Sequence, residues 1–192
     1  MKNVLLTLGI AAVLASCGSS NKSEEKAEQA TTAKSEQTAM EEEASSADKN
    51  TDVSAVIEAY LSIKDALVND DQEKAATAGK SLASALGEMN MSQVSEGQKA
   101  EANEIIEVAK NHGEHIAESE IDHQREHFEA LGKDMKDLIA ITGTDRKLYQ
   151  QYCPMYNDNK GGMWLSASEE IRNPLFGSKM LKCGKVEEVI NL

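Results

Sequence analysis

Four sulfur-bearing side chains lie in two short motifs near the C-terminal end of the 192-residue chain. They form a Cys-Pro-Met motif and a Met-x-x-Cys motif, which comprise Cys153, Met155, Met180 and Cys183. Thiolate and thioether sulfur are soft ligands that select soft metal ions, above all Cu(I). The residue types therefore predict a soft-metal site built from these four side chains.

The same two cysteines allow a second interpretation. Exported proteins fold in an oxidising compartment, where paired cysteines usually form a disulfide. A Cys153–Cys183 disulfide would close a loop of about 30 residues and stabilise the fold by about 3–4 kcal/mol. Met155 and Met180 would then only pack nearby. Sulfur spacing alone leaves metal ligation and the disulfide open.

Other side chains are weaker candidate ligands. His123 and His127 are four residues apart on a predicted helix, so both imidazoles can reach one metal ion, although they also fit a solvated polar face. Met163 is a further weak candidate. His112 lies on the apolar stripe of the preceding predicted helix and is expected in the core, whereas His115 is expected to be exposed.

Two residues are expected to act structurally. Arg125 lies close to the apolar stripe of its predicted helix, and a half-buried guanidinium needs acceptors. We expect it to bind a carboxylate or loop carbonyls and to hold the C-terminal segment on the helices. Trp164, the only tryptophan, is the second expected structural residue.

The sequence argues against two broad functions. A formal charge of −13 argues against nucleic acid as a partner, because phosphates require a basic surface. No phosphate-binding glycine loop, nucleophile-elbow serine or His-Glu-x-x-His pair is present, so we expect no enzyme activity.

Helical periodicity dominates the middle of the chain. Apolar residues recur three and four positions apart in four segments between residues 52 and 142. The second and third segments open with Asp70-x-x-Glu73 and Ser95-x-x-Gln98, which resemble capping boxes, and the fourth follows Ser119 and ends at Gly143. Short linkers favour a mainly α fold, an antiparallel up-and-down four-helix bundle.

The last part of the chain differs in character. Short β-like runs occur at Leu148–Tyr152, Met163–Leu165 and Lys185–Ile190, and glycine-bearing turns separate them. We expect residues 148–192 to form a small irregular or β cap that carries the Cys and Met residues. The whole predicted domain spans residues 52–192.

The N-terminal residues resemble a bacterial lipoprotein signal. A basic start and a short apolar run end in Leu14-Ala15-Ser16-Cys17, which is similar to a lipobox. Residues 1–16 would be removed, and acylated Cys17 would anchor the protein in the membrane. Gly18 stands where inner-membrane retention would use Asp, so we expect the outer membrane, facing the periplasm, with cell-surface display as the alternative.

Residues 17–51 are predicted to form a disordered acidic tether. Between residues 18 and 50 no aromatic or branched aliphatic side chain occurs. Such a segment buries too little apolar surface to offset the entropy of ordering it.

Several motifs resemble the family called domain of unknown function 3347. They are Tyr152-Cys153-Pro154-Met155, Gly161-Gly162-Met163-Trp164-Leu165-Ser166, Ile171-Arg172-Asn173-Pro174-Leu175-Phe176-Gly177 and Met180-Leu181-Lys182-Cys183-Gly184, with Gln124-Arg125-x-x-Phe128 and the Tyr60-to-Asp70 helix upstream. The resemblance covers most of residues 52–190. Members occur in envelope lipoproteins and fused to adaptor subunits of heavy-metal efflux pumps for copper and silver.

The resemblance implies a role in envelope metal handling. It places the two cysteines, Met155 and Met180 on family positions, whereas Tyr156 and Leu175 depart from the usual residues. We therefore expect a lipid-anchored envelope protein that binds Cu(I) for buffering or for delivery to a heavy-metal efflux assembly. The alternative is a non-metal interaction module that binds another envelope protein and contains a structural Cys153–Cys183 disulfide.

Overall fold

The computed structural model describes residues 51–191, with side chains from residue 53 onward. The expected signal peptide, the lipidation site Cys17 and nearly all of the expected tether lie outside the described residues. No helix within the described residues is both long enough and apolar enough to span a membrane.

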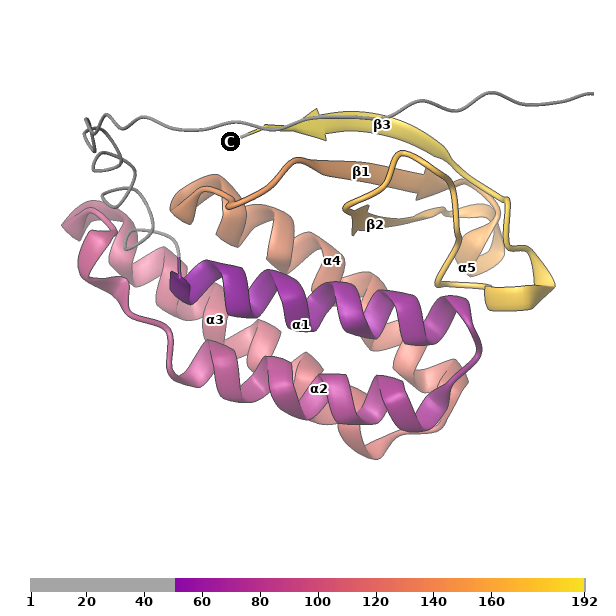
Figure 1. Cartoon of the computed structure of the whole chain (residues 1–192), viewed down its shortest axis with the longest axis horizontal. Coiled ribbons are helices and arrows are strands. Elements are labelled where there is room, and N and C mark those ends of the chain that lie inside the picture. Colours follow the sequence, from indigo (N-terminus) through magenta and orange to yellow (C-terminus); the bar gives the residue numbers. More distant parts are fainter. Residues whose placement is uncertain (1–50, 192) are drawn as a thin grey trace, which may run out of the picture. The chain divides into compact units, whose positions relative to one another are not determined.

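Four long helices form most of the domain (Figure 1): α1 Thr51–Val68, α2 Gln72–Gly87, α3 Glu96–Glu118 and α4 Ile121–Thr142. Consecutive helices pack against each other, and short connections make each neighbouring pair antiparallel. The predicted mainly helical fold with four helices is confirmed. A short 3-10 helix, η1 Met91–Gln93, lies in the connection between α2 and α3.

The start of α2 differs from the expected capping box by one residue. Asp71 is the N-cap, and its carboxylate accepts a hydrogen bond from the backbone N–H of Lys74 at 3.0 Å. Asp70 has a left-handed backbone, with a φ of 56°. Its side chain is therefore free to contact other parts of the fold.

Close packing between α2 and α3 depends on two glycines. A Cβ atom at Gly79 would lie 2.7 Å from the carbonyl oxygen of Gly113, so only a hydrogen fits there. The core of the bundle is otherwise aliphatic, apart from the stacked rings of Tyr60 and Phe128, whose centroids lie 5.0 Å apart.

A three-stranded antiparallel sheet follows the helices, with strand order β2-β1-β3. Its strands are β1 Leu148–Cys153, β2 Gly162–Ser166 and β3 Lys185–Ile190, which confirms the small C-terminal cap. Every residue of β2 is buried, and this strand contacts α4 and α1 (Figure 1). The backbone N–H of Leu165 donates to the hydroxyl of Tyr60 at 3.0 Å, which joins the sheet to α1.

Two short turns complete the cap, and in the first of them Asn157, Asp158 and Asn159 have left-handed backbone angles. The segment α5, Tyr156–Asn159, follows β1, and the 3-10 helix η2, Gly177–Lys179, lies between β2 and β3. Both turns carry residues that line the site described next.

Candidate functional site

The two cap cysteines form a disulfide. It joins Cys153, the last residue of β1, to Cys183 in the loop before β3, with Cα atoms 5.7 Å apart. Cys153 is completely buried, whereas Cys183 is partly exposed. In this oxidised form neither sulfur is a thiolate, so neither can bind a soft metal ion as the sequence hypothesis requires.

The methionines occupy different environments. Met155 is 49% exposed, and Met155 and Met180 both line one cavity in the cap. Met163 is only 8% exposed and packs on Gly132 of α4, where an added Cβ would lie 3.1 Å from its sulfur. Met163 is therefore a packing residue, and the structure does not bring it into the cavity that Met155 and Met180 line.

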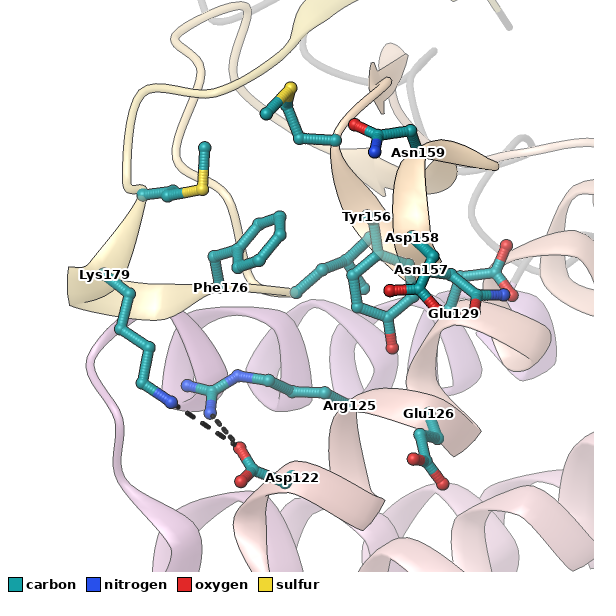
Figure 2. A pocket seen from close by; sticks show the side chains of 13 residues that line it. Asp122, Arg125, Glu126, Glu129, Tyr156, Asn157, Asp158, Asn159, Phe176 and Lys179 are labelled. Carbon is teal, nitrogen blue, oxygen red and sulfur yellow. Dashed lines mark hydrogen bonds and ion pairs between the residues drawn. The ribbon is translucent and has the colours of Figure 1, made fainter.

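The cavity has a volume of about 780 Å³ and lies between the first turns of α4, α5 and residues 175–180. Figure 2 shows side chains from all three segments around it. The lining residues are Asp122, Arg125, Glu126, Glu129, Met155, Tyr156, Asn157, Asp158, Asn159, Leu175, Phe176, Lys179 and Met180. Leu175 and Tyr156, which we expected to depart from the family pattern, both line it.

Carboxylates outnumber cations around this cavity. Asp122, Glu126, Glu129 and Asp158 line it together with two basic side chains, Arg125 and Lys179, and Lys133 pairs with Glu129 from outside the lining at 2.8 Å. Burial, reinforced by carboxylates led by Glu129, raises the pKa of Tyr156 to about 12. The cavity therefore favours a cationic ligand over an anionic one.

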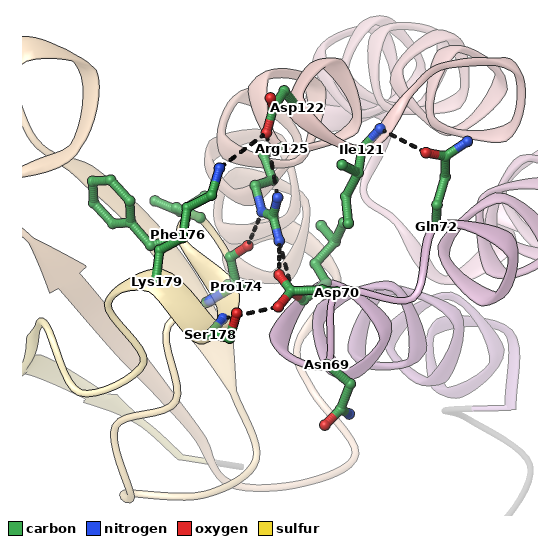
Figure 3. A network of polar contacts seen from close by, with 12 residues as sticks. Asn69, Asp70, Gln72, Ile121, Asp122, Arg125, Pro174, Phe176, Ser178 and Lys179 are labelled. Atoms are coloured by element: carbon green, nitrogen blue, oxygen red, sulfur yellow. Dashed lines mark hydrogen bonds and ion pairs between the residues drawn. The ribbon is translucent and has the colours of Figure 1, made fainter.

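Arg125 connects the helices to the cap (Figure 3). Its Nε donates to the carbonyl oxygen of Pro174 at 3.1 Å, and its Nη2 donates to the carbonyl oxygen of Leu67 at 3.2 Å. The same Nη2 also donates to Asp70 Oδ1 at 2.5 Å. The guanidinium is 5% exposed and has the carboxylate and carbonyl partners that its burial requires.

Asp70 completes this connection. Its Oδ2 accepts a hydrogen bond from the backbone N–H of Ser178 at 3.1 Å. Hydrogen bonds from Ser178, and then from Arg125, lower the pKa of Asp70 against the opposing effect of burial. Gly177 has a φ of 57°, and a Cβ there would overlap Asp70 Oδ1 and approach Arg125 Nη2. Gly177 thus permits the contact between η2 and the bundle.

Buried amide side chains hold the rest of the cap. Trp164 is fully buried, and its Nε1 donates to Gln151 Oε1 at 2.7 Å. Asn173 Nδ2 donates to the carbonyl oxygen of Cys183 at 2.8 Å, which fixes the loop that carries the second cysteine. Sequence reasoning missed Gln151 and Asn173, and the signal for the second was its place before Pro174, where Asn favours a turn.

The histidines lie elsewhere, on α3 and α4. The ring of His123 packs against the ring of His127, as its position four residues earlier allows. The rings of His112 and His115 also pack against His127, although these two residues were expected to have separate roles. His112 is partly buried, with 20% of its side chain exposed. Within residues 53–191, no three His, Cys, Asp or Glu side chains already converge on one metal position.

Part of the chain matches a family model. Residues 56–147 match the family described as "Protein of unknown function (DUF3347)", which supports this domain family for the four helices. The match ends before β1, so the cap motifs between residues 152 and 184 lie beyond it. Searches of the curated proteins and of the solved structures found no match.

Proposed function

We propose that this chain is a lipid-anchored envelope protein whose cap binds Cu(I) when its disulfide is reduced. The observation that carries the proposal is the pairing of Cys153 and Cys183, which lie two and three residues along the chain from Met155 and Met180, the methionines that line one cavity. Two thiols and two thioethers form a soft ligand set. We assign no catalytic role to the domain.

Metal binding requires a change of redox state. A dithiol reductant would transfer two electrons to the sulfur pair, and two protons would convert it into two thiols. Binding of Cu(I) would then release thiol protons to solvent, because the thiolate is the ligand. Cys183 is the more exposed partner, so reductant attack at its sulfur is the favoured route.

The charge of the cavity supports uptake of a cation. Four carboxylates around the cavity raise the local concentration of positive ions. Exposed Met155 offers an initial soft ligand without the thiols. The cavity would thus receive the ion before the reduced cysteines bind it.

The cellular setting is also part of the proposal. The lipobox-like Leu14-Ala15-Ser16-Cys17 supports outer-membrane anchoring. The resemblance to a family expected to be fused to heavy-metal efflux adaptors supports a role in buffering Cu(I) or delivering it to an efflux assembly. The family match itself states no function.

Competition titration tests the proposal directly. Reduced protein should take Cu(I) from a chromogenic Cu(I) chelator with one ion per chain, and the disulfide form should bind far more weakly. A double variant, Cys153→Ser with Cys183→Ser, should lose this binding, and Met155→Leu with Met180→Leu should weaken it. Unchanged affinity in the cysteine double variant would overturn the proposal.

A second candidate function rests on the disulfide as it stands. Cys153 is completely buried, and Asn173 donates a hydrogen bond to the carbonyl oxygen of Cys183. Both features suit a permanent structural crosslink. The acidic cavity, with the edge-to-face rings of Tyr156 and Phe176, would then bind a cationic segment of another envelope protein. Intact mass with and without reductant, followed by metal titration, distinguishes the two. A permanent disulfide and no Cu(I) uptake after reduction would favour this candidate.

A further inference from the structure

All four histidines of the chain gather on one seam of the bundle. His112 and His115 lie on α3, and His123 and His127 lie on α4. These helices are joined by a very short connection and run antiparallel, so the end of one packs beside the start of the other. The seam is separate from the cysteines and methionines of the cap.

His127 is the centre of this histidine cluster. Its Nδ1 lies 2.9 Å from His112 Nδ1, and its Nε2 lies 3.1 Å from His123 Nε2. The ring of His115 stacks on it with a centroid distance of 4.5 Å and an interplanar angle of 4°. Three imidazoles therefore contact a fourth that is only partly exposed.

His112 and His127 favour the neutral state. Burial, followed by the proximity of His112 and the other two histidines, lowers the pKa of His127 to about 4. Burial also lowers the pKa of His112. A neutral imidazole has one nitrogen with a free lone pair, which is the form that binds metal ions.

Hydrogen-bond partners determine which nitrogen is available. His123 Nδ1 lies 2.8 Å from Glu126 Oε2, and a carboxylate accepts, so His123 carries its proton on Nδ1. The lone pair of His123 Nε2 then points at His127 Nε2. In the metal-free chain a proton on His127 Nε2 fills the space between these two nitrogens.

We propose that a borderline divalent metal ion, Zn²⁺, Cu²⁺ or Ni²⁺, replaces that proton and is bound by Nε2 of His123 and Nε2 of His127. Two nitrogens 3.1 Å apart, each about 2.0–2.1 Å from the ion, subtend roughly 100° at it, which suits these metals. With 55% of its side chain exposed, His123 is open to an incoming ion.

Outer partners for both ligands are already in place. Metal-binding histidines usually donate their second N–H to a carboxylate or another acceptor, which fixes the ring. Glu126 accepts from His123, and His112 Nδ1 is placed to accept from His127 Nδ1. This double arrangement distinguishes the pair from two histidines that are merely neighbours on a helix.

An isolated carboxylate oxygen lies at the end of this chain of contacts. Asp134 Oδ2 is buried without a hydrogen-bond partner and lies 3.6 Å from His112 Nε2. When the metal binds, the proton on His127 Nε2 leaves to solvent, and the proton that His112 Nδ1 shared with His127 Nδ1 moves onto His127. His112 takes up a proton on Nε2, facing that oxygen, which balances the one released. Metal binding would then give Asp134 a donor, with no net loss of protons from the three rings.

The remaining coordination positions are open. No third ligand converges on the ion in the present geometry, so water and a rotated His115 would complete the coordination. His115 is exposed and stacks parallel to His127, so rotation of its side chain meets little packing resistance. Imidazole ligands favour borderline divalent ions, whereas the cap sulfurs favour Cu(I), so this site is independent of the proposed cap function.

Zinc titration of the full chain with its disulfide intact tests the inference, because the oxidised cap has no thiolate ligands. After chelator treatment, the protein should bind one Zn²⁺ per chain by calorimetry and show a higher Tm with Zn²⁺. His123→Gln should lose at least 100-fold in affinity, and Glu126→Gln should lose about 10–100-fold. Cu²⁺-loaded protein should show nitrogen hyperfine coupling in electron paramagnetic resonance.

Two controls keep the test decisive. His123 is largely exposed, so its replacement leaves the fold intact, as circular dichroism will verify. The variant Cys153→Ser with Cys183→Ser should keep the Zn²⁺ affinity, which separates this site from the cap. Zn²⁺ binding that is equally strong in His123→Gln, or no Zn²⁺ binding by the folded wild-type protein, would overturn the proposal.

Discussion

Arg125 and Asp70 join the two parts of the domain through a hydrogen-bonded ion pair, with Nη2 and Oδ1 2.5 Å apart. Asp70 follows the end of α1, Arg125 belongs to α4, and both bind the cap, at Ser178 and Pro174 respectively. One guanidinium and one carboxylate thereby hold the cavity wall against the bundle.

Replacing Arg125 should destabilise the fold. Arg125→Met removes hydrogen bonds to Pro174, Leu67 and Asp70. The Leu67 carbonyl oxygen keeps the backbone N–H of Asp70 as a donor, but the carbonyl oxygen of Pro174 and the Asp70 carboxylate lose their guanidinium donor. We expect a loss of about 2–3 kcal/mol in the free energy of unfolding, measured by urea denaturation. The matched control is Lys182→Met, which breaks the pair with Glu170, exposed on both sides, and should change stability by less than about 0.5 kcal/mol. Equal effects in both variants would contradict this structural role for Arg125.

The Asp70 contact should make stability depend on acid pH. Its pKa is lowered in the folded state, so the unfolded chain binds a proton first as the pH falls. The stabilisation from Asp70 is therefore complete above about pH 5 and is lost as the pH falls through its folded pKa. Urea denaturation between pH 6 and pH 2.5 should show a smaller decline for Asp70→Asn than for the wild-type protein. Parallel curves for the two proteins would contradict the contact.

A methyl group at Gly177 should disturb the same contact. Gly177→Ala places a Cβ against Asp70 and Arg125 and forces a left-handed φ of 57° on an alanine. We expect a loss of more than about 1 kcal/mol in thermal or urea unfolding. The control is Gly97→Ala in α3, where nothing lies within 4 Å of the added atom, and helix propensity predicts equal or higher stability.

Reduction of the Cys153–Cys183 disulfide should loosen the cap before the bundle. The bond closes a long loop, so its loss should cost about 2–4 kcal/mol of stability. Hydrogen exchange should accelerate first in β3 and in residues 167–184, while α2 and α3 stay protected. A uniform increase in exchange across both regions would indicate that the cap and the bundle unfold as one unit.

The local pattern of apolar residues was sufficient to predict the helices and the strands. Apolar residues at helical spacing predicted four helices, and the runs at 148–152, 163–165 and 185–190 predicted the three strands, because these periods follow from backbone geometry within each segment. The predicted cap at Asp70 was wrong by one residue, because the neighbouring Asp71 suits an N-cap equally well. The contact between Asp70 and Arg125 cannot be seen in the local sequence.

The sequence by itself determined which residues carry soft sulfur, which helix faces are apolar and that His123 and His127 share one side of a helix. Tertiary structure alone decided that Cys153 bonds to Cys183, that Met163 packs inside, and that His112 and His115 reach the other histidines. These outcomes depend on how one element is rotated and shifted against another. Such relations arise from the packing of distant segments, and no local periodicity encodes them.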